Sequence, residues 1–381
     1  MSLAHLGHRD TDMTHSLPRD LRAARLRALG VVTAHVGDLG EARDAVDRAL
    51  VSLDEQEPPA DLAGTLLEIA WATAGRTDPV PHVAEDDASA VLSLLAACCH
   101  SSLPMAARIA LMLAVAGGFP TDEIARAFAV PDQTMERRLA WSEDRARALL
   151  GRVIPDELTA EPLDSVLDVL MLVFDDGIIH PHCHLDLPYE AVETTRVLVE
   201  QFPAESEPRA ALAIMLLTRA RRDARVAPDG SLIPFGLQDR SRWHRDEIDE
   251  GLFLLRASRR QNPSGPYQIR ATIQSEHVNA PSAEDTDWDR ILALHDQLMT
   301  LAPSDLVALS RATALAEVRG AEAALKVVEG FGLDSHLYHA TRADLLSRLG
   351  HQEEADRAWT AAVARVRSAR EHARLRGTLE G

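Results

Sequence analysis

The chain contains few aromatic residues, few cysteines and almost no lysine. Aromatic residues make up 4% of its 381 residues, whereas hydrophobic residues together make up 46%. A core that is poor in aromatic residues must be built mainly from Leu, Ala and Val, and such a core suits packed helices better than sheets. The composition therefore predicts an all-α fold, and the length allows two or three domains.

The cysteines and the hydrophobic runs argue against two further classes of protein. Three cysteines, of which Cys98 and Cys99 are adjacent, do not make a disulfide framework and indicate a reducing compartment. We expect Cys98 and Cys99 to be buried free thiols. No apolar run reaches transmembrane length, and the N-terminus lacks a signal-peptide pattern. These features predict a cytoplasmic protein that has no membrane partner.

Positive charge is scarce in this chain. Lys326 is its single lysine, and the net charge is −19. Attraction to nucleic-acid phosphates needs local positive charge, so the composition argues against a protein that coats nucleic acid. A small basic surface on an acidic body remains compatible with these numbers.

Residues 106–152 have the pattern of a helix-turn-helix. Thr121 is expected to cap a short first helix, which Pro131 interrupts. The second helix places Met135 and Leu139 on its inner face. Its other side chains are of the kinds that contact base edges and phosphates in a major groove, namely Gln133, Thr134, Arg137, Arg138 and Arg145. An ordinary pair of helices in an all-helical protein explains the pattern equally well.

Two runs of this segment resemble region 4 of the extracytoplasmic-function sigma factors. They are EIARAFAV at residues 123–130 and TMERRL at residues 134–139. The resemblance implies that the second helix contacts promoter DNA. Between residues 131 and 147, however, four arginines are balanced by four acidic residues. Each lost phosphate contact lowers the salt-dependent affinity, so we expect weak DNA binding in isolation.

Residues 37–50, GDLGEARDAVDRAL, are similar to the helix by which sigma region 2 docks on RNA polymerase. The resemblance implies that Asp44, Asp47 and Arg48 face core RNA polymerase, although a solvated helix face would carry the same residues. The next stretch, residues 61–78, departs from the family. Its counterpart melts promoter DNA with basic and aromatic residues, whereas this stretch has one basic residue, three acids and a Trp71 that is expected in the core. The melting surface is therefore predicted to be lost or reduced.

The C-terminal half is predicted to be helical, with internal repeats. Residues 163–175 are strongly apolar and are expected in the core, and residues 340–355 follow the rhythm of a tetratricopeptide repeat. Helix pairs with Ala and Leu at their packing positions predict a solenoid with a concave binding surface.

Four further motifs lie at residues 223–226, 237–243, 265–273 and 280–288. They are similar to the C-terminal domain of one sigma-factor subgroup, and the resemblance implies regulation in cis. The candidate residues are Arg225, Gln238, Asp239, Arg240, Arg242, Trp243, Tyr267, Gln268, Asp285, Asp287 and Trp288. We interpret them as residues that hold long loops onto the helices through Arg–carboxylate pairs. A catalytic polar cluster with aromatic walls is the alternative.

A histidine cluster at residues 180–186 is the one candidate metal site. Its potential ligands are His180, His182, Cys183 and His184, and alternate residues of an extended segment share a face. Zinc or another transition metal would fit these ligands. The alternative is a solvated loop between helices, which we favour, so the prediction includes no cofactor.

The sequence thus predicts three domains: a sigma region-2-like domain at 1–80, a region-4-like domain at 81–155, and a tetratricopeptide-like domain at 156–381. The leading hypothesis is a cytoplasmic transcription regulator of the sigma-factor type that binds core RNA polymerase and promoter DNA. The alternative is a sigma-like protein that does not initiate transcription and binds a protein or small ligand through its C-terminal domain. Without a Ser-His-Asp elbow, P-loop or dinucleotide fingerprint, no enzyme activity is predicted.

Overall fold

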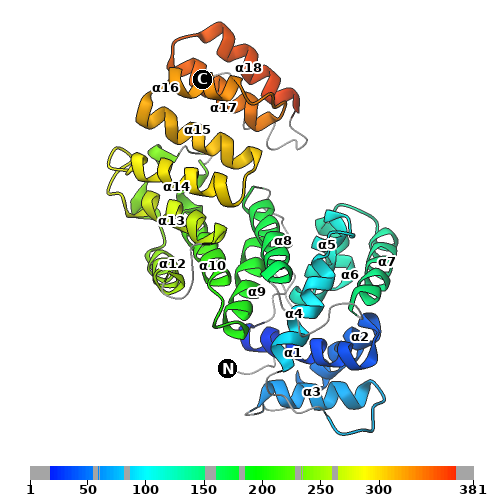
Figure 1. Ribbon diagram of the computed structural model, residues 1–381. Coiled ribbons are helices and arrows are strands. Elements are labelled where there is room, and N and C mark those ends of the chain that lie inside the picture. The colour runs from blue at the N-terminus through cyan, green and yellow to red at the C-terminus, as the bar shows by residue number, and fades with distance from the viewer. Residues whose placement is uncertain are drawn as a thin grey trace. The chain divides into compact units, whose positions relative to one another are not determined.

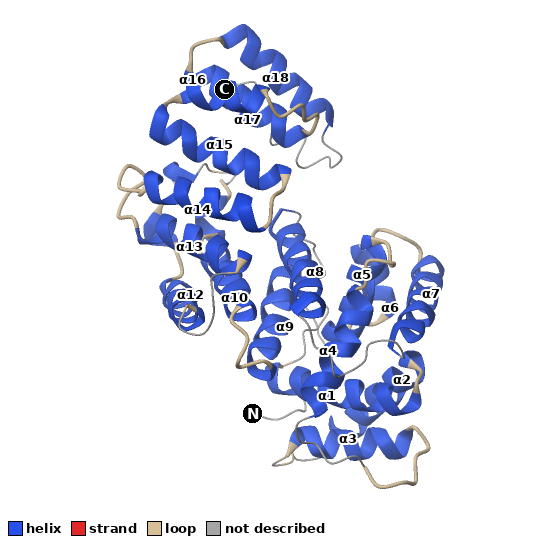
Figure 2. Cartoon of the chain, in the orientation of Figure 1, coloured by secondary structure: helices blue, strands red, loops and turns tan. Residues whose placement is uncertain are grey.

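Every regular element that the structure describes is a helix (Figures 1 and 2). The structure is a computed structural model that describes residues 18–54, 59, 61–80, 86–150, 160–179, 185–227, 233, 235–259 and 265–365. This result confirms the predicted all-α class. Within the described ranges, none of the helices combines the length and the hydrophobicity needed to cross a membrane.

The chain divides into two compact units, Met1–Pro203 and Ala204–Gly381, called unit 1 and unit 2 below. The domain boundaries predicted near residues 80 and 155 lie within unit 1, and they remain predictions. Unit 1 contains α1 (Arg19–Val36), α2 (Leu39–Asp54), α3 (Leu62–Thr73), α4 (Asp86–Cys99), α5 (Met105–Met112), the π-helix η1 (Leu113–Gly117), α6 (Thr121–Ala127), α7 (Asp132–Leu150), α8 (Ala160–Ile179) and α9 (Leu187–Gln201).

Unit 1 is assembled around α1, which packs against α2, α3 and α4 and also contacts η1 and α9. Leu26, Leu29 and Val32 of α1 are fully buried, as their helical spacing predicts. Gly37 ends α1 with a φ of 74°, a left-handed conformation that suits glycine after a helix. The first helix therefore joins the early helices of unit 1 to η1 and α9.

Helix α8 also contributes to this core. It packs against α4 and α9, and Val166, Leu167 and Phe174 are fully buried. The apolar run at residues 163–175 is thus core, as the sequence predicts.

Unit 2 is a succession of helices in which α10 packs against α12 and α13, and each helix from α12 to α18 packs against the next one. They are α10 (Glu207–Arg219), α11 (Arg222–Arg225), the short η3 (Phe235–Leu237) and η4 (Arg240–Arg242), α12 (Arg245–Ser258), α13 (Pro266–Asn279), α14 (Trp288–Leu301), α15 (Asp305–Arg319), α16 (Ala321–Glu329), α17 (His336–Arg348) and α18 (Gln352–Arg365). In the last pair, Ala343 and Leu346 of α17 pack with Ala355 and Ala358 of α18. The tetratricopeptide-like arrangement remains a prediction.

Candidate functional site

Helices α6 and α7 are joined by a tight turn. Phe128 ends α6, Ala129 takes a left-handed φ of 51°, and the Val130 N–H donates to the Ala125 carbonyl at 3.0 Å. Pro131 then precedes α7. The turn matches the sequence prediction, but the predicted Thr121 cap is wrong. Thr121 is already the first residue of α6, and it follows Pro120, which has no side chain able to cap.

The inner face of α7 is apolar and its outer face is polar. Met135 and Leu139 are buried within unit 1, whereas Gln133, Arg137 and Arg145 are exposed. These three side chains can reach a ligand such as DNA without any rearrangement of the helix.

Two of the predicted DNA-binding residues are less accessible. Thr134 and Arg138 are half-buried. The Arg138 guanidinium carbon lies 5.4 Å from the centre of the Phe128 ring, so this side chain packs across the turn between α6 and α7. Arg138 therefore stabilises the turn, and Arg137 and Arg145 carry the accessible positive charge of this face.

Trp141 is a further exposed residue of α7 that the sequence analysis did not identify. Its exposed fraction is 52%, although tryptophan is usually well buried. It lies four residues after Arg137 and four before Arg145, so the three side chains follow one face of the helix. The sequence already indicated this exposure, because Trp141 does not fall on the inner face of the helix that Met135 and Leu139 define.

Two ion pairs connect α7 to α2 and to Asp38, the residue directly before α2. Arg43 lies 2.7 Å from Glu143, and Arg147 lies 2.7 Å from Asp38. Burial raises the pKa of Glu143, and the nearby Arg43 opposes this change. Glu143 thus has a partner inside the chain, and this ion pair joins α7 to α2.

The residues predicted to face polymerase lie on α2. Asp44, Asp47 and Arg48 are exposed. Asp47 already has a partner within the chain, because Arg25 donates to its carboxylate at 3.0 Å through Nε. Asp44 and Arg48 are therefore the more accessible members of this face.

The stretch predicted to lack a melting surface lies on α3 and in the residues that follow it. Trp71, the aromatic residue of this stretch, is buried and donates its indole N–H to the Asp78 carbonyl at 3.0 Å. Arg76, the basic residue, packs over the Trp71 ring with its guanidinium carbon 5.2 Å from the ring centre. Trp71 is therefore a core residue, as predicted, and does not offer its face to a base.

Two buried arginines of α1 cap the end of the π-helix η1. The last carbonyls of a helix have no partner within the helix. Arg25 donates to the carbonyls of Val115 and Ala114, the latter at 3.2 Å, and Arg22 donates to the Ala116 carbonyl at 3.2 Å. Both arginines are almost completely buried. Cations at a helix C-terminus also interact favourably with the helix dipole.

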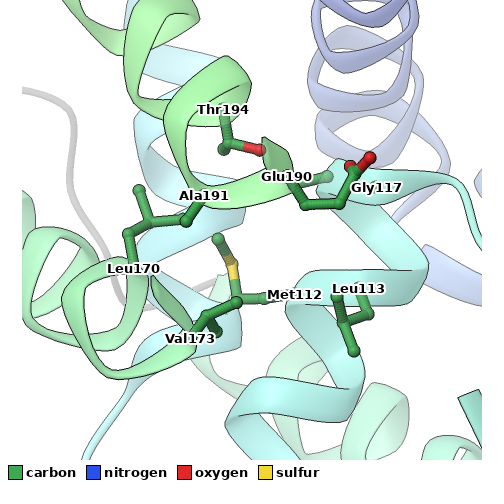
Figure 3. Close-up of a pocket in the computed structure, with 9 residues that line it drawn as sticks. Met112, Leu113, Gly117, Leu170, Val173, Glu190, Ala191 and Thr194 are labelled. Carbon is green, nitrogen blue, oxygen red and sulfur yellow. The ribbon is translucent and has the colours of Figure 1, made fainter. Parts of the chain in front are cut away.

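A buried ion pair extends this contact to α9. Arg22 Nη1 lies 2.6 Å from Glu190 Oε2, and both side chains are buried. Glu190 lies beside Gly117 at the edge of a narrow, mostly apolar pocket between η1, α8 and α9 (Figure 3). The pair Arg22–Glu190 therefore joins α1, η1 and α9.

The candidate metal site lies outside the described residues. His180, His182, Cys183 and His184 all fall in the range 180–184, which the structure does not describe. Among the residues that it does describe, no group of three potential metal ligands is found. Cys98 and Cys99 are buried free cysteines, as predicted, and burial raises the pKa of both thiols.

The C-terminal motifs occupy two ends of α13 in unit 2. At its start, the Tyr267 N–H donates to Glu207 at 2.8 Å, and Gln268 Nε2 donates to Ser206 Oγ at 2.8 Å. Tyr267 and Gln268 are both buried. These residues therefore attach α13 to the start of α10.

The second group of motif residues lies at the end of α13. Arg240 Nη1 donates to the carbonyls of His277 and Ala280, at 3.3 and 2.7 Å. The Arg240 guanidinium carbon lies 4.5 Å from the centre of the Trp243 ring, and His277 lies 5.3 Å from the Trp288 ring centre. The predicted Arg–carboxylate pairing is wrong for Arg240, which binds helix-end carbonyls instead.

The remaining motif residues have local roles or are exposed. Asp287 caps α14 by accepting from the Arg290 N–H at 2.9 Å, and Asp239 accepts from the Ser241 N–H at 2.9 Å. Asp285 accepts from Ser282 Oγ at 2.8 Å. The list is completed by buried Gln238, half-buried Arg225 and exposed Arg242. The motifs thus form two clusters rather than one site.

The described helices define an all-α protein of two compact units. Comparison with known proteins shows the family to which the chain belongs. A family of unknown function, DUF6596, matches residues 162–259. The chain is 36% identical to an uncharacterized protein of Rhizobium meliloti (strain 1021) over 332 residues, which are 85% of this chain and 77% of that protein. The chain belongs to the same family as the Rhizobium protein. No solved structure gave a significant match.

Proposed function

We propose that the protein is a transcription regulator of the extracytoplasmic-function sigma type. The observation that carries the proposal is the α6–turn–α7 pair, in which α7 buries Met135 and Leu139 and exposes Gln133, Arg137 and Arg145. A helix that follows a tight turn and exposes such side chains is suited to the major groove. Promoter DNA would then contact the exposed face of α7.

Core RNA polymerase is the proposed protein partner, and it would contact α2. Asp44 and Arg48 are exposed on that helix. The C-terminal helices would regulate these contacts in cis, as the resemblance of their motifs implies. The protein is proposed to act without catalytic chemistry of its own.

A specific observation favours a second candidate, a sigma-like protein that binds polymerase without starting transcription. Trp71 is buried and Arg76 packs on it, so α3 offers neither stacking surface nor free charge to an unpaired strand. The ion pairs Arg43–Glu143 and Arg147–Asp38 also hold α2 against α7. Promoter melting by this chain alone would be weak.

The experiment that separates the two candidates is a pull-down of core RNA polymerase followed by run-off transcription. Asp44→Ala and Arg48→Ala should weaken retention of the protein on polymerase. Asp249→Ala, an equal charge change at an exposed position of α12, is the control for Asp44→Ala. Binding with transcripts supports the first candidate, and binding without transcripts supports the second. Absence of binding at low salt contradicts both.

A further inference from the structure

The ring of Phe235 is the centre of a cluster in unit 2. The guanidinium carbons of Arg221 and Arg240 lie 5.0 and 5.4 Å from its centre. The ring centres of His277 and Trp243 lie 5.0 and 5.9 Å from it. Two cationic side chains and two nitrogen-bearing rings thus surround one phenyl group. This set is called the Phe235 cluster below.

Positive charge accumulates in this cluster although the protein has a net charge of −19. Burial, together with repulsion from Arg225 and Arg240, lowers the pKa of Arg221 to about 10. Arg221 and Arg240 form no ion pair with a carboxylate in the described part of the chain. Asp285 attracts Arg240 only through its charge, and it is exposed and bonded to Ser282.

Hydrogen-bonding nitrogens of the cluster are also left without partners. Four buried nitrogens have no hydrogen-bond partner among the described residues: Arg221 Nε, Arg240 Nη2, Trp243 Nε1 and His277 Nδ1. Trp243 as a whole is only 4% exposed. A buried hydrogen-bonding atom without a partner costs about 1 to 3 kcal/mol, so four such atoms around one ring are not explained by the fold itself.

We infer that the Phe235 cluster binds an oxyanion group, the carboxylate or phosphate of a small molecule. Guanidinium and indole groups donate hydrogen bonds, and a neutral imidazole donates one through its single N–H, whereas an oxyanion accepts several at once. Its negative charge would offset the repulsion between Arg221, Arg225 and Arg240. The aromatic walls formed by Phe235 and Trp243 lower the local polarity and strengthen each of these interactions.

This inference goes beyond the proposed regulation of transcription, because it names a ligand class for unit 2. It stands on contacts within that unit and does not need the polymerase or DNA contacts of unit 1. A failure of either proposal therefore leaves the other testable.

Thermal unfolding of the full chain with inorganic phosphate or with acetate tests the inference. Sodium chloride at equal ionic strength corrects for the general effect of salt. A ligand that binds the folded state alone raises the melting temperature in a saturable way, and we expect a rise of several degrees. A larger effect of phosphate than of acetate would identify a phosphate site, and the reverse a carboxylate site.

The variants Arg221→Gln and Trp243→Phe each remove an unpartnered donor. We expect at least a tenfold loss of anion affinity in Arg221→Gln and a smaller loss in Trp243→Phe, which keeps an aromatic ring. Arg242→Gln is the matched control, because it removes one charge at an exposed position of η4. Its affinity should equal that of the wild type.

The His277 ring gives a second measurement that does not depend on a variant. Its pKa is lowered to about 4 by burial and by the charges of Arg221, His295 and Arg240. A bound anion should raise this pKa, which proton NMR of the histidine rings can follow. No rise in melting temperature beyond that of chloride, or an equal rise in Arg221→Gln, would overturn the inference.

Discussion

Each unit brings two guanidinium groups close together, the fully buried Arg22 and Arg25 in unit 1 and the half-buried Arg221 and Arg240 in unit 2. In unit 1 the charges have internal partners: three carbonyls of η1 and the carboxylates of Glu190 and Asp47. In unit 2, Arg240 reaches two carbonyls, but neither arginine has an ion pair within the described residues.

This difference separates a structural use of buried charge from a binding use. A buried charge whose partners lie within the chain is strongly destabilising only when one partner is removed. A buried donor without a partner is already unfavourable, and a ligand can recover that free energy. The arginines of unit 1 therefore hold helices together, whereas those of unit 2 are available to an anion.

The largest expected effect on stability comes from breaking the buried ion pair between Arg22 and Glu190 in unit 1. Glu190→Gln keeps the shape of the side chain but leaves the Arg22 charge buried without a countercharge. We expect a loss of about 3 to 5 kcal/mol in the free energy of unfolding, measured by urea denaturation and far-ultraviolet circular dichroism. Glu41→Gln, the same change at an exposed position of α2, is the control and should have almost no effect. Equal losses in both variants would refute the structural role.

A smaller effect is expected from acid in unit 2. The pKa of His277 is about 4 in the folded protein and about 6.5 as its ordinary value. Between these values the unfolded chain binds a proton that the folded chain does not, so stability falls as the pH falls from about 6.5 to about 4. The loss is about 3 kcal/mol at most.

Denaturation at several pH values, with wild type and His277→Gln compared, checks this expectation. The variant should lose less stability over the same pH range. Phosphate should reduce the loss in the wild type, because a bound anion favours the protonated ring. Parallel pH profiles for the two proteins would contradict the lowered pKa.

The sequence predicts those features that depend on residues close together along the chain. It does not predict contacts between residues that are far apart in the sequence. Leu26, Leu29 and Val32 have the spacing of a buried helical face, and Pro131 predicts the turn before α7. The partners of Arg22 and Arg25 in η1 lie some 90 positions along the chain. Periodicity within one helix contains no information about such partners.

The C-terminal motifs show the same limit in another form. Their residue types correctly indicate loops fixed to helices, and Asp287 does cap α14. The expectation that Arg240 would bind a carboxylate failed, because the nearest acceptors are the carbonyls at the end of α13. The Phe235 cluster also depends on His277 and Arg221, which lie outside the motif residues singled out in the sequence.

The smallest effect on stability is expected when an exposed arginine is replaced. Such a variant provides a reference for the variants of the less exposed arginines. Arg137→Ala should change the free energy of unfolding by no more than about 0.5 kcal/mol. If α7 contacts DNA, this variant should weaken binding to promoter DNA by about 1 kcal/mol and lower the salt slope by about one. Fluorescence anisotropy at several salt concentrations measures both quantities.

Arg256→Ala, at an exposed position of α12, is the matched control for this DNA experiment. It removes the same charge from unit 2 and should leave DNA binding unchanged. An identical decrease in both variants would show that net charge, rather than the face of α7, determines the affinity.

The most direct test of the distinction between the two arginine pairs is one substitution made in each unit. Arg25→Met removes the partner of two carbonyls and Asp47, and we expect it to cost about 3 to 5 kcal/mol in the free energy of unfolding. Arg221→Met removes an unpartnered donor and a repulsive charge, so its change should stay within about 1 kcal/mol. Equal losses in the two variants, or a larger loss in Arg221→Met, would contradict the distinction.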